Sequence, residues 1–190
     1  MIELTLASQS PRRLQMLQSL GLNPRVQPAD IDETPWPDEP ALAHVQRLAR
    51  AKCEAIDHPC VLAADTIVLC DEHILGKPTD ADDFRGMMNQ LSGRQHQVYT
   101  AWHLRHAAQH QFGVECTQVH FATLSPDMIE AYWASGEPAD KAGGYGIQGW
   151  GGLLVERIEG DFNNVVGLPL KAVAQALAQI GLNPWRLDAR

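Results

Sequence analysis

Residues 61–70 place the strongest constraint on the fold. Their sequence, Val-Leu-Ala-Ala-Asp-Thr-Ile-Val-Leu-Cys, is a nearly continuous apolar run of strand length. Such a run is typical of a strand that is buried on both faces, so other elements must cover it on either side. Asp65 interrupts the run, and burying an unpaired carboxylate costs free energy. It is therefore either a metal ligand or general base, or a strand-end aspartate that accepts backbone hydrogen bonds, and the residues alone favour neither.

Strand patterns and helix patterns alternate along the rest of the chain. The helix segments begin at cap residues or proline and end near glycine or serine. The second helix is expected to bury one stripe, formed by Leu42, Val45, Ala49, Cys53 and Ile56. These patterns predict an α/β fold in which helices pack against a mixed sheet. The predicted strands are 2–7, 25–27, 61–70, 95–105, 112–123 and 153–158, and the predicted helices are 11–21, 40–56, 78–93, 125–136 and 169–180.

The composition fits one compact globular unit. The chain has 190 residues and a formal net charge of −8, so we expect one domain over residues 1–190 and no surface for long nucleic acid. No segment approaches the ~18 consecutive apolar residues of a membrane span, and no secretion signal is visible. Four cysteines occur without a C-x-x-C pair, which indicates reduced thiols. We therefore expect a soluble cytoplasmic protein.

A polar loop from Ser8 to Arg13 separates the first predicted strand from the first predicted helix. Free backbone N–H groups and the helix dipole favour an anion at such a helix N-terminus, and Arg12 and Arg13 could clamp phosphate oxygens. Ser10 is expected to cap the helix. The alternative, a capped helix with solvated arginines, is the commoner outcome for any one loop of this kind.

Three further cations stand where a ligand could approach. Lys52 lies beside the apolar stripe of its predicted helix, so its ammonium points either into a cleft or, as a lone lysine more often does, to water. Lys77 and Arg94 each follow a glycine, where the backbone can approach a ligand closely. None of the three identifies a site by itself.

Two tempting motifs are excluded by their context. Residues 144–149 match G-x-G-x-x-G, but a strand follows them instead of the helix that dinucleotide binding requires, so the glycines are interpreted as a flexible, close-fitting wall. His103, His106 and His110 lie in a predicted hairpin without an acidic partner, so we interpret them as a solvated turn rather than a metal site. A P-loop sequence, G-x-x-x-x-G-K-[ST], does not occur.

Six segments together resemble the Maf family, and they extend over almost the whole chain. The resemblance implies an elongated mixed β-sheet with helices packed around it and two lobes flanking a cleft, which is the Maf-like or inosine triphosphate pyrophosphatase-like fold. It also implies a cytoplasmic protein, usually a homodimer, that uses a divalent metal cation such as Mg²⁺ or Mn²⁺. The segments are 6–13, 64–68, 76–78, 91–96, 137–149 and 164–170.

The activity implied by this resemblance is that of a nucleoside triphosphate pyrophosphatase. Such an enzyme would hydrolyse dTTP and UTP to the monophosphate and pyrophosphate, as house-cleaning of nucleotide pools. Residues 140–143 and 147–149 are similar to the dTTP and UTP branch rather than the 7-methyl-GTP branch. Two alternatives stay open: a pyrophosphatase for a modified nucleotide such as 7-methyl-GTP, and a nucleotide-sensing inhibitor of septum formation in cell division. A pure sensor has little need of Asp65 beside phosphates, which a carboxylate repels.

The family motifs imply a role for each candidate residue. Asp65 is the expected proton acceptor, and with Glu33 it offers the hard oxygen ligands that magnesium takes. Arg12, Thr66 and Gln148 are expected to influence which base is accepted. The remaining cleft residues are Asp140 and, as expected phosphate contacts, Ser8, Ser10, Arg13, Lys52, Lys77 and Lys141.

Overall fold

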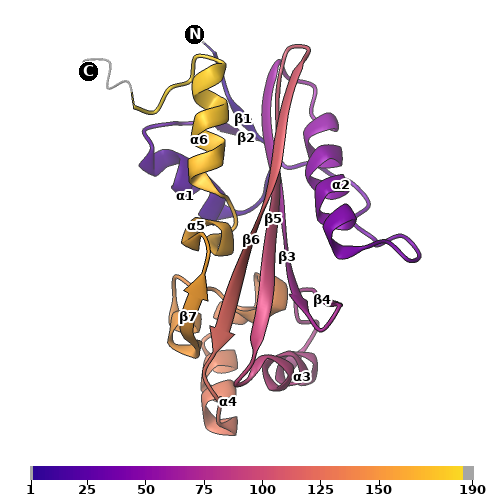
Figure 1. Ribbon diagram of the computed structural model, residues 1–190, viewed down its shortest axis with the longest axis vertical. Helices are drawn as coiled ribbons and strands as arrows, with labels where there is room; N and C mark the ends of the chain where they lie inside the picture. The colour runs from indigo at the N-terminus through magenta and orange to yellow at the C-terminus, as the bar shows by residue number, and fades with distance from the viewer. Residues whose placement is uncertain (1, 186–190) are drawn as a thin grey trace. The chain divides into compact units, whose positions relative to one another are not determined.

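The computed structural model describes residues 2–185, which form seven β-strands, six α-helices and three short 3-10 helices (Figure 1). The strands are β1 (Thr5–Leu6), β2 (Arg25–Val26), β3 (Cys60–Cys70), β4 (His73–Leu75), β5 (Gln95–His106), β6 (Gln109–Phe121) and β7 (Val155–Glu159). The α-helices are α1 (Pro11–Ser19), α2 (Ala41–Glu54), α3 (Ala81–Leu91), α4 (Pro126–Ala134), α5 (Phe162–Val166) and α6 (Leu170–Gln179). The 3-10 helices are η1 (Glu137–Asp140), η2 (Ala142–Gly144) and η3 (Trp150–Leu154).

The strands form one mixed sheet. Their order is β2-β1-β3-β5-β6-β7, and β4 pairs with β3. β1 pairs in parallel with β2 and β3, whereas β4 is antiparallel to β3 and β7 is antiparallel to β6. The prediction of an α/β fold with a mixed sheet is therefore confirmed.

The described residues group into two compact units. The first unit contains residues 2–65, 100–115 and 167–185, and the second unit contains residues 66–99 and 116–166. Because β3, β5 and β6 each cross a boundary between these ranges, all three strands contribute residues to both units. The expectation of a single domain over residues 1–190 stays a prediction.

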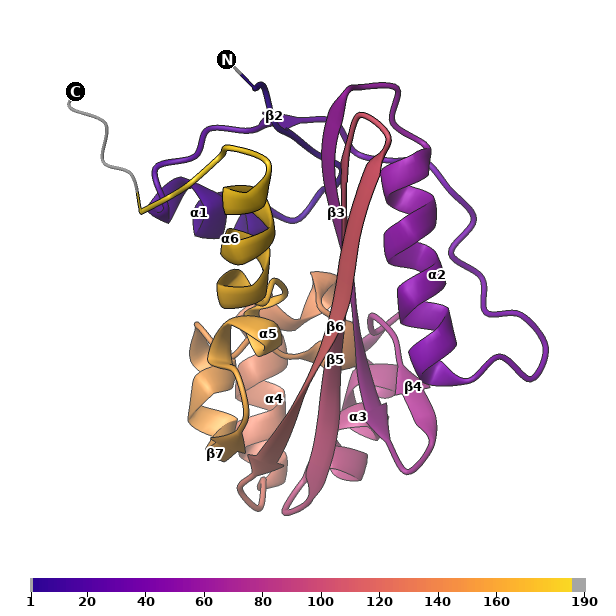
Figure 2. The same ribbon diagram turned by 45° about the horizontal axis from the view of Figure 1, so that its top comes forward.

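Helices cover two sides of the strands in the first unit. α1 and α6 lie side by side on one side of β1 and β3, and α2 lies on the other side (Figures 1 and 2). All β3 residues from 60 to 64 are buried, as predicted for a strand that is covered on both faces. Cys53 and Ile56 pack with Ala7, Val61 and Ala63 in a buried apolar cluster of this unit.

The second unit has an apolar core of its own around α3 and α4. Phe84 of α3 is fully buried, and its ring centroid lies 5.0 Å from that of Trp133 and 6.0 Å from that of Tyr132, both on α4. Gly144 approaches the same ring: a Cβ there would lie 3.0 Å from Phe84 Cδ2, and its φ of +69° is left-handed. Glycine is therefore required where the glycine-rich segment enters this core.

Most predicted elements are confirmed, but several of their ends differ. The first strand is limited to Thr5–Leu6, and the hairpin turn lies at 107–108, so β6 begins at Gln109. Residues 153–154, predicted as strand, belong to η3 because a short apolar run does not by itself distinguish strand from helix. β4 and α5 were not predicted, since elements of three and five residues are too short to show a period.

The buried face of α2 differs from the prediction at its first turn. Leu42 was expected to face the core, but it is 44% exposed. The first turn buries His44 instead, and its ring Nδ1 lies 2.9 Å from Glu39 Oε2. A polar side chain with a hydrogen-bond partner can take a buried position, which the apolar pattern cannot show. The other members of the predicted stripe, Val45, Ala49, Cys53 and Ile56, are buried as predicted.

Cellular location is predicted from the sequence alone. Within residues 2–185, every helix is too short or too polar to cross a bilayer. Cys53, Cys60 and Cys70 are buried free thiols, Cys116 is an exposed one, and burial raises the pKa of Cys53 and Cys60 to about 11. The cytoplasmic location stays a prediction.

Phe84→Ala tests the separate core of the second unit. Removing a fully buried ring leaves a cavity, so we expect the free energy of unfolding to fall by about 3–5 kcal/mol. Urea denaturation followed by circular dichroism measures this loss. The matched control is Phe112→Ala, because Phe112 is 71% exposed and its removal should change stability by less than about 1 kcal/mol. Equal losses at the two positions would contradict the described packing.

Candidate functional site

Asp65 is buried in β3 next to a lysine ammonium. The residue is only 7% exposed. Lys52 Nζ donates a hydrogen bond to Asp65 Oδ1 at 2.7 Å, and the same Nζ lies 2.9 Å from Glu33 Oε1. One ammonium thus lies within 3 Å of two carboxylates, and it compensates the buried charge that made Asp65 conspicuous in the sequence.

The position of Lys52 on α2 explains this contact. Lys52 lies in the last turn of the helix, next to Cys53 and four residues after Leu48, both of which are buried. Its aliphatic stem is therefore covered, with the side chain 11% exposed, and the ammonium is directed at Asp65. The alternative that Lys52, as a lone lysine more often does, points its ammonium to water is therefore wrong. A cation in the last turn also interacts favourably with the helix dipole.

Arg13 is held inside the protein by oxygen atoms of the first unit. Its Nε donates to the Gly167 carbonyl at 2.8 Å, and its Nη1 donates to Ser8 Oγ at 3.0 Å and to the Ala64 carbonyl at 2.8 Å. Burial lowers the pKa of Arg13, and the nearby Asp65 carboxylate opposes that shift. Arg13 is therefore not a solvated arginine. It fixes the polar loop against the residue that precedes Asp65, and its contact with phosphate stays a prediction.

The two loop serines satisfy backbone amides at the start of α1. Ser10 caps the helix as predicted, because its Oγ accepts from the Arg13 amide at 3.5 Å. Ser8 Oγ accepts from the Ser10 amide at 3.2 Å. A hydroxyl that accepts can also donate its own proton, so both side chains are compatible with a phosphate oxygen. Arg12, which follows Pro11, is partly exposed beside them.

Glu39 organises the irregular segment that carries Glu33. Its Oε1 accepts from Arg47 Nε at 2.6 Å, and its Oε2 accepts from Arg47 Nη2 at 2.7 Å and from the Trp36 amide at 3.1 Å. The His44 ring adds the fourth contact to this carboxylate. These contacts hold the pKa of Glu39 at about 2: the Arg47 hydrogen bonds contribute most, and partial burial opposes them.

Arg47 makes two more contacts to the same segment. Its Cζ lies 4.2 Å from the centroid of the Trp36 ring, and its Nη2 donates to the Thr34 carbonyl at 3.1 Å. Thr34 is the neighbour of Glu33, whose side chain is 56% exposed. The Arg47–Glu39 pair therefore orders the acidic, proline-rich segment between β2 and α2. No pattern in the sequence pairs residues eight positions apart across a helix start.

The candidate residues of the second unit lie on β3 and in two neighbouring loops. Thr66 follows Asp65 on β3 and is half-buried, and Lys77 is exposed after Gly76. The Gly76 carbonyl accepts from the Gly143 amide at 2.8 Å. This bond brings the loop of Lys77 next to the glycine-rich segment of the same unit.

Lys141 and Gln148 belong to that glycine-rich segment. Lys141 Nζ donates to the Glu137 carbonyl at 2.5 Å and lies 2.7 Å from Asp140 Oδ1. Asp140 therefore forms an ion pair with Lys141, which is itself a predicted phosphate contact. The Gln148 side chain is exposed, as its predicted contact with a base requires. Glu137, whose carboxylate accepts a hydrogen bond from the Trp150 amide of the same segment, was not among the predicted site residues.

The three histidines do not form the solvated turn that was predicted. His103 is 6% exposed on β5, and its Nε2 lies 2.9 Å from His110 Nδ1. Its ring also stacks on Phe112, with centroids 5.7 Å apart. The prediction was wrong because His103, inside β5, packs against His110 and Phe112 of β6 and is shielded from solvent. Within residues 2–185, the structure places no three His, Cys, Asp or Glu side chains together as a metal-binding group.

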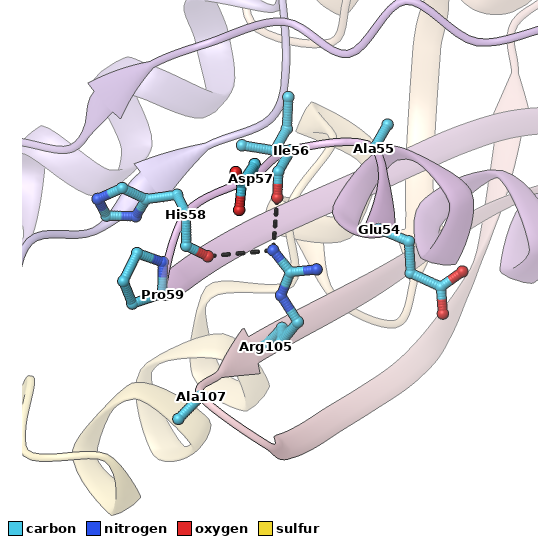
Figure 3. A pocket seen from close by; sticks show the side chains of 8 residues that line it. All are labelled: Glu54, Ala55, Ile56, Asp57, His58, Pro59, Arg105 and Ala107. Atoms are coloured by element: carbon cyan, nitrogen blue, oxygen red, sulfur yellow. Dashed lines mark hydrogen bonds between the residues drawn. The ribbon is translucent and has the colours of Figure 1, made fainter.

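A surface hollow of about 440 Å³ lies at the C-terminal end of α2 (Figure 3). Arg105 points into it and donates from Nη2 to the Ile56 carbonyl and to the His58 carbonyl at 3.0 Å. An arginine at this position satisfies carbonyl groups after the helix end. None of the predicted site residues lines the hollow. We therefore interpret it as part of the structure that ends α2, and not as a ligand site. Its lining residues are 54–59, Arg105 and Ala107.

Comparison with known proteins shows the family of this chain. A sequence model described as Maf-like protein matches residues 3–180, so the chain belongs to the Maf family. The dTTP/UTP pyrophosphatase of Anaeromyxobacter dehalogenans strain 2CP-1 is 48% identical over 188 residues, covering 96% of each chain. The dTTP/UTP pyrophosphatase of Syntrophomonas wolfei is 47% identical over 187 residues, covering 95% of this chain and 99% of its own. The predicted family is thereby confirmed.

One solved structure is a more distant match. The Staphylococcus aureus Ham1 protein aligns with a TM-score of 0.44 and 12% identity, covering 64% of this chain and 72% of its own. No conclusion about function follows from a likeness of this size.

Glu39→Gln tests the ordering of the loop that carries Glu33. The folded-state pKa of Glu39 is about 2 against an ordinary value of 4.5, so the carboxylate stabilises the fold above pH 4.5 and this stability is lost as the pH falls toward 2. We expect Glu39→Gln to lower Tm at pH 7, and the difference from wild type to shrink between pH 4.5 and 2.

Thermal unfolding across this pH range measures the difference. The exposed Glu156 supplies the control, because Glu156→Gln should leave Tm nearly unchanged at every pH. A Tm difference for Glu39→Gln that stays constant from pH 7 to pH 2 would contradict the assigned contacts.

Proposed function

We propose that this Maf-family protein is a nucleoside triphosphate pyrophosphatase that hydrolyses dTTP and UTP to the monophosphate and pyrophosphate. The observation that carries the proposal is the extent of its similarity to relatives named dTTP/UTP pyrophosphatase, which are 47–48% identical over at least 95% of this chain. The contacts of Asp65, Lys52 and Glu33 are consistent with hydrolysis of an anionic substrate, because they join a positioned carboxylate and a cation.

Asp65 is the proposed proton acceptor. Its Oδ1 is fixed by the Lys52 ammonium at 2.7 Å, which leaves the carboxylate in a defined orientation on a rigid strand. In the proposed reaction it takes a proton from the water that attacks the α-phosphorus. The bond to the oxygen that bridges the α- and β-phosphorus breaks, and pyrophosphate leaves. Lys52 places positive charge where negative charge develops on the phosphate oxygens.

Glu33 and Asp65 fit a divalent cation. Both carboxylates converge on Lys52 Nζ, and Glu33 is the more exposed of the two. Magnesium is commonly held by one or two carboxylates together with substrate phosphates, so two hard oxygen donors of this kind suffice. A bound divalent ion would neutralise charge on the phosphate oxygens. Mg²⁺ and Mn²⁺ both match this donor set.

The other candidate residues keep the roles proposed from the family motifs. Ser8, Ser10 and Arg13 would contact the triphosphate at the start of α1, where amide groups and the helix dipole favour anions. Lys77 and Lys141 are further cations for phosphate oxygens. Thr66 and Gln148, together with Arg12, would influence the base. A homodimer and a cytoplasmic location stay predictions.

A substrate panel tests the proposed reaction. Purified protein is given dTTP, UTP, dCTP, ATP, GTP and 7-methyl-GTP with Mg²⁺, and products are separated by ion-exchange chromatography. We expect dTTP and UTP to be hydrolysed with the highest kcat/KM and to yield monophosphate and pyrophosphate in equal amounts. A preference for 7-methyl-GTP would contradict the proposed base choice, and release of orthophosphate would contradict the proposed bond choice.

Asp65→Asn tests the proposed proton acceptor. The substitution is nearly isosteric, so we expect the fold and nucleotide binding to be retained while kcat falls by about 10²–10⁴-fold. Circular dichroism, calorimetric titration with a non-hydrolysable triphosphate and steady-state kinetics measure the three properties. Asp82→Asn is the control, because Asp82 is 93% exposed on α3 and should not affect turnover. Unaltered kcat in Asp65→Asn would remove Asp65 from the mechanism.

A further inference from the structure

The Glu137 carboxylate accepts three hydrogen bonds, two of them from backbone amides of the glycine-rich segment 146–151 and one from a tyrosine of α4. Its Oε1 accepts from the Tyr132 hydroxyl at 2.8 Å and from the Gly151 amide at 3.1 Å. Its Oε2 accepts from the Trp150 amide at 2.8 Å. Two consecutive backbone amides at the start of η3 thus point at one carboxylate, as they do at an anion bound by a helix N-terminus.

Tyr132 connects the other end of the segment to the same carboxylate. Its hydroxyl accepts from the Gly146 amide at 3.0 Å while it donates to Glu137, and the residue is only 2% exposed. Residues 146 and 151 are therefore both tied to the Glu137–Tyr132 pair. Lys141 Nζ adds a contact to the Glu137 backbone carbonyl.

The segment approaches these side chains more closely than any residue other than glycine allows. A Cβ at Gly149 would lie 2.1 Å from Glu137 Oε2, and one at Gly151 would lie 2.5 Å from the Tyr132 hydroxyl. Real Cβ contacts are not this short. The glycines that the sequence marks as a close-fitting wall therefore wrap around Glu137 itself.

The charge of Glu137 is stabilised by these contacts. Partial burial raises the pKa of Glu137, but the amides of Gly151 and Trp150 and the Tyr132 hydroxyl outweigh it, so the net shift is downward. At neutral pH the segment therefore surrounds a charged carboxylate, and charge-assisted hydrogen bonds are stronger than neutral ones.

Gln148 lies in the middle of this segment with an exposed side chain. A free side-chain amide can pair with several base edges, so it discriminates between bases only if its backbone is held in one position. We propose that Glu137 is a positioning residue for base selection, which holds segment 146–151 and thereby fixes the orientation of Gln148. The proposal rests on the function proposed above.

Glu137→Gln tests this role with little change in volume. Its amide oxygen can replace one carboxylate oxygen, but its NH₂ group would face a backbone N–H that has lost its acceptor. The control is Glu130→Gln, the same substitution on neighbouring α4, where Glu130 is exposed and pairs with Arg85 instead. A residue that only stabilises the protein would lower kcat/KM equally for every base.

The first measurement is the ratio of kcat/KM for dTTP to kcat/KM for dATP. We expect Glu137→Gln to lower this ratio by about tenfold, the effect of one lost hydrogen bond in an organised contact, and Glu130→Gln to leave it unchanged. A ratio that stays at the wild-type value in Glu137→Gln would overturn the proposal.

The second measurement is amide hydrogen exchange of residues 146–151, which does not depend on activity. We expect exchange at Trp150 and Gly151 to rise at least about tenfold in Glu137→Gln and not in Glu130→Gln. Unchanged exchange would also overturn the proposal. If the wild-type protein hydrolyses neither dTTP nor UTP, the proposed function fails instead, and hydrogen exchange still decides whether Glu137 holds the segment.

Discussion

The ammonium of Lys52 between the carboxylates of Asp65 and Glu33 is the interaction on which the candidate site depends. β3 is buried on both faces, so a charged carboxylate in its middle would be costly without a partner. Lys52 provides that partner from α2, which packs beside β3 in the first unit. The same contact fixes the direction of the carboxylate. Stability and the proposed chemistry therefore depend on one pair of atoms.

The residues of the site are held in turn by charged groups whose hydrogen-bond partners are other protein atoms. Arg13 joins the loop of Ser8 to the Ala64 carbonyl, directly before Asp65. Glu39 and Arg47 order the segment of Glu33 in the first unit, and Glu137 orders the segment of Gln148 in the second. In each case an ionised side chain is surrounded by several hydrogen-bond partners, which is the condition under which buried or half-buried charge is stable. This arrangement gives irregular segments the rigidity that a binding site needs.

The sequence predicts the elements and the unusual aspartate well, because both depend on local patterns. Asp65 stands out in an apolar run, and Ser10 is recognisable as a cap beside Pro11. The direction of Lys52 could not be predicted, because helical spacing allows the ammonium to reach either a cleft or water. The roles of Glu39 and Glu137 were missed, because Arg47 and Gly151, with which they pair, lie eight and fourteen residues further along the chain, where no periodicity links the partners. The burial of Arg13 could not be predicted, because two of its three acceptors, the Ala64 and Gly167 carbonyls, come from distant parts of the chain.

The coupling between Lys52 and Asp65 can be measured directly by a double-mutant cycle in urea denaturation. Lys52→Met should destabilise the protein, because it leaves Asp65 charged and without its partner in a buried strand. Adding Asp65→Asn removes that charge, so the account predicts that the double variant regains part of the lost stability, with a coupling free energy of about 1–3 kcal/mol. Additive effects of the two substitutions would contradict it, because the ammonium would then not be what stabilises the buried carboxylate.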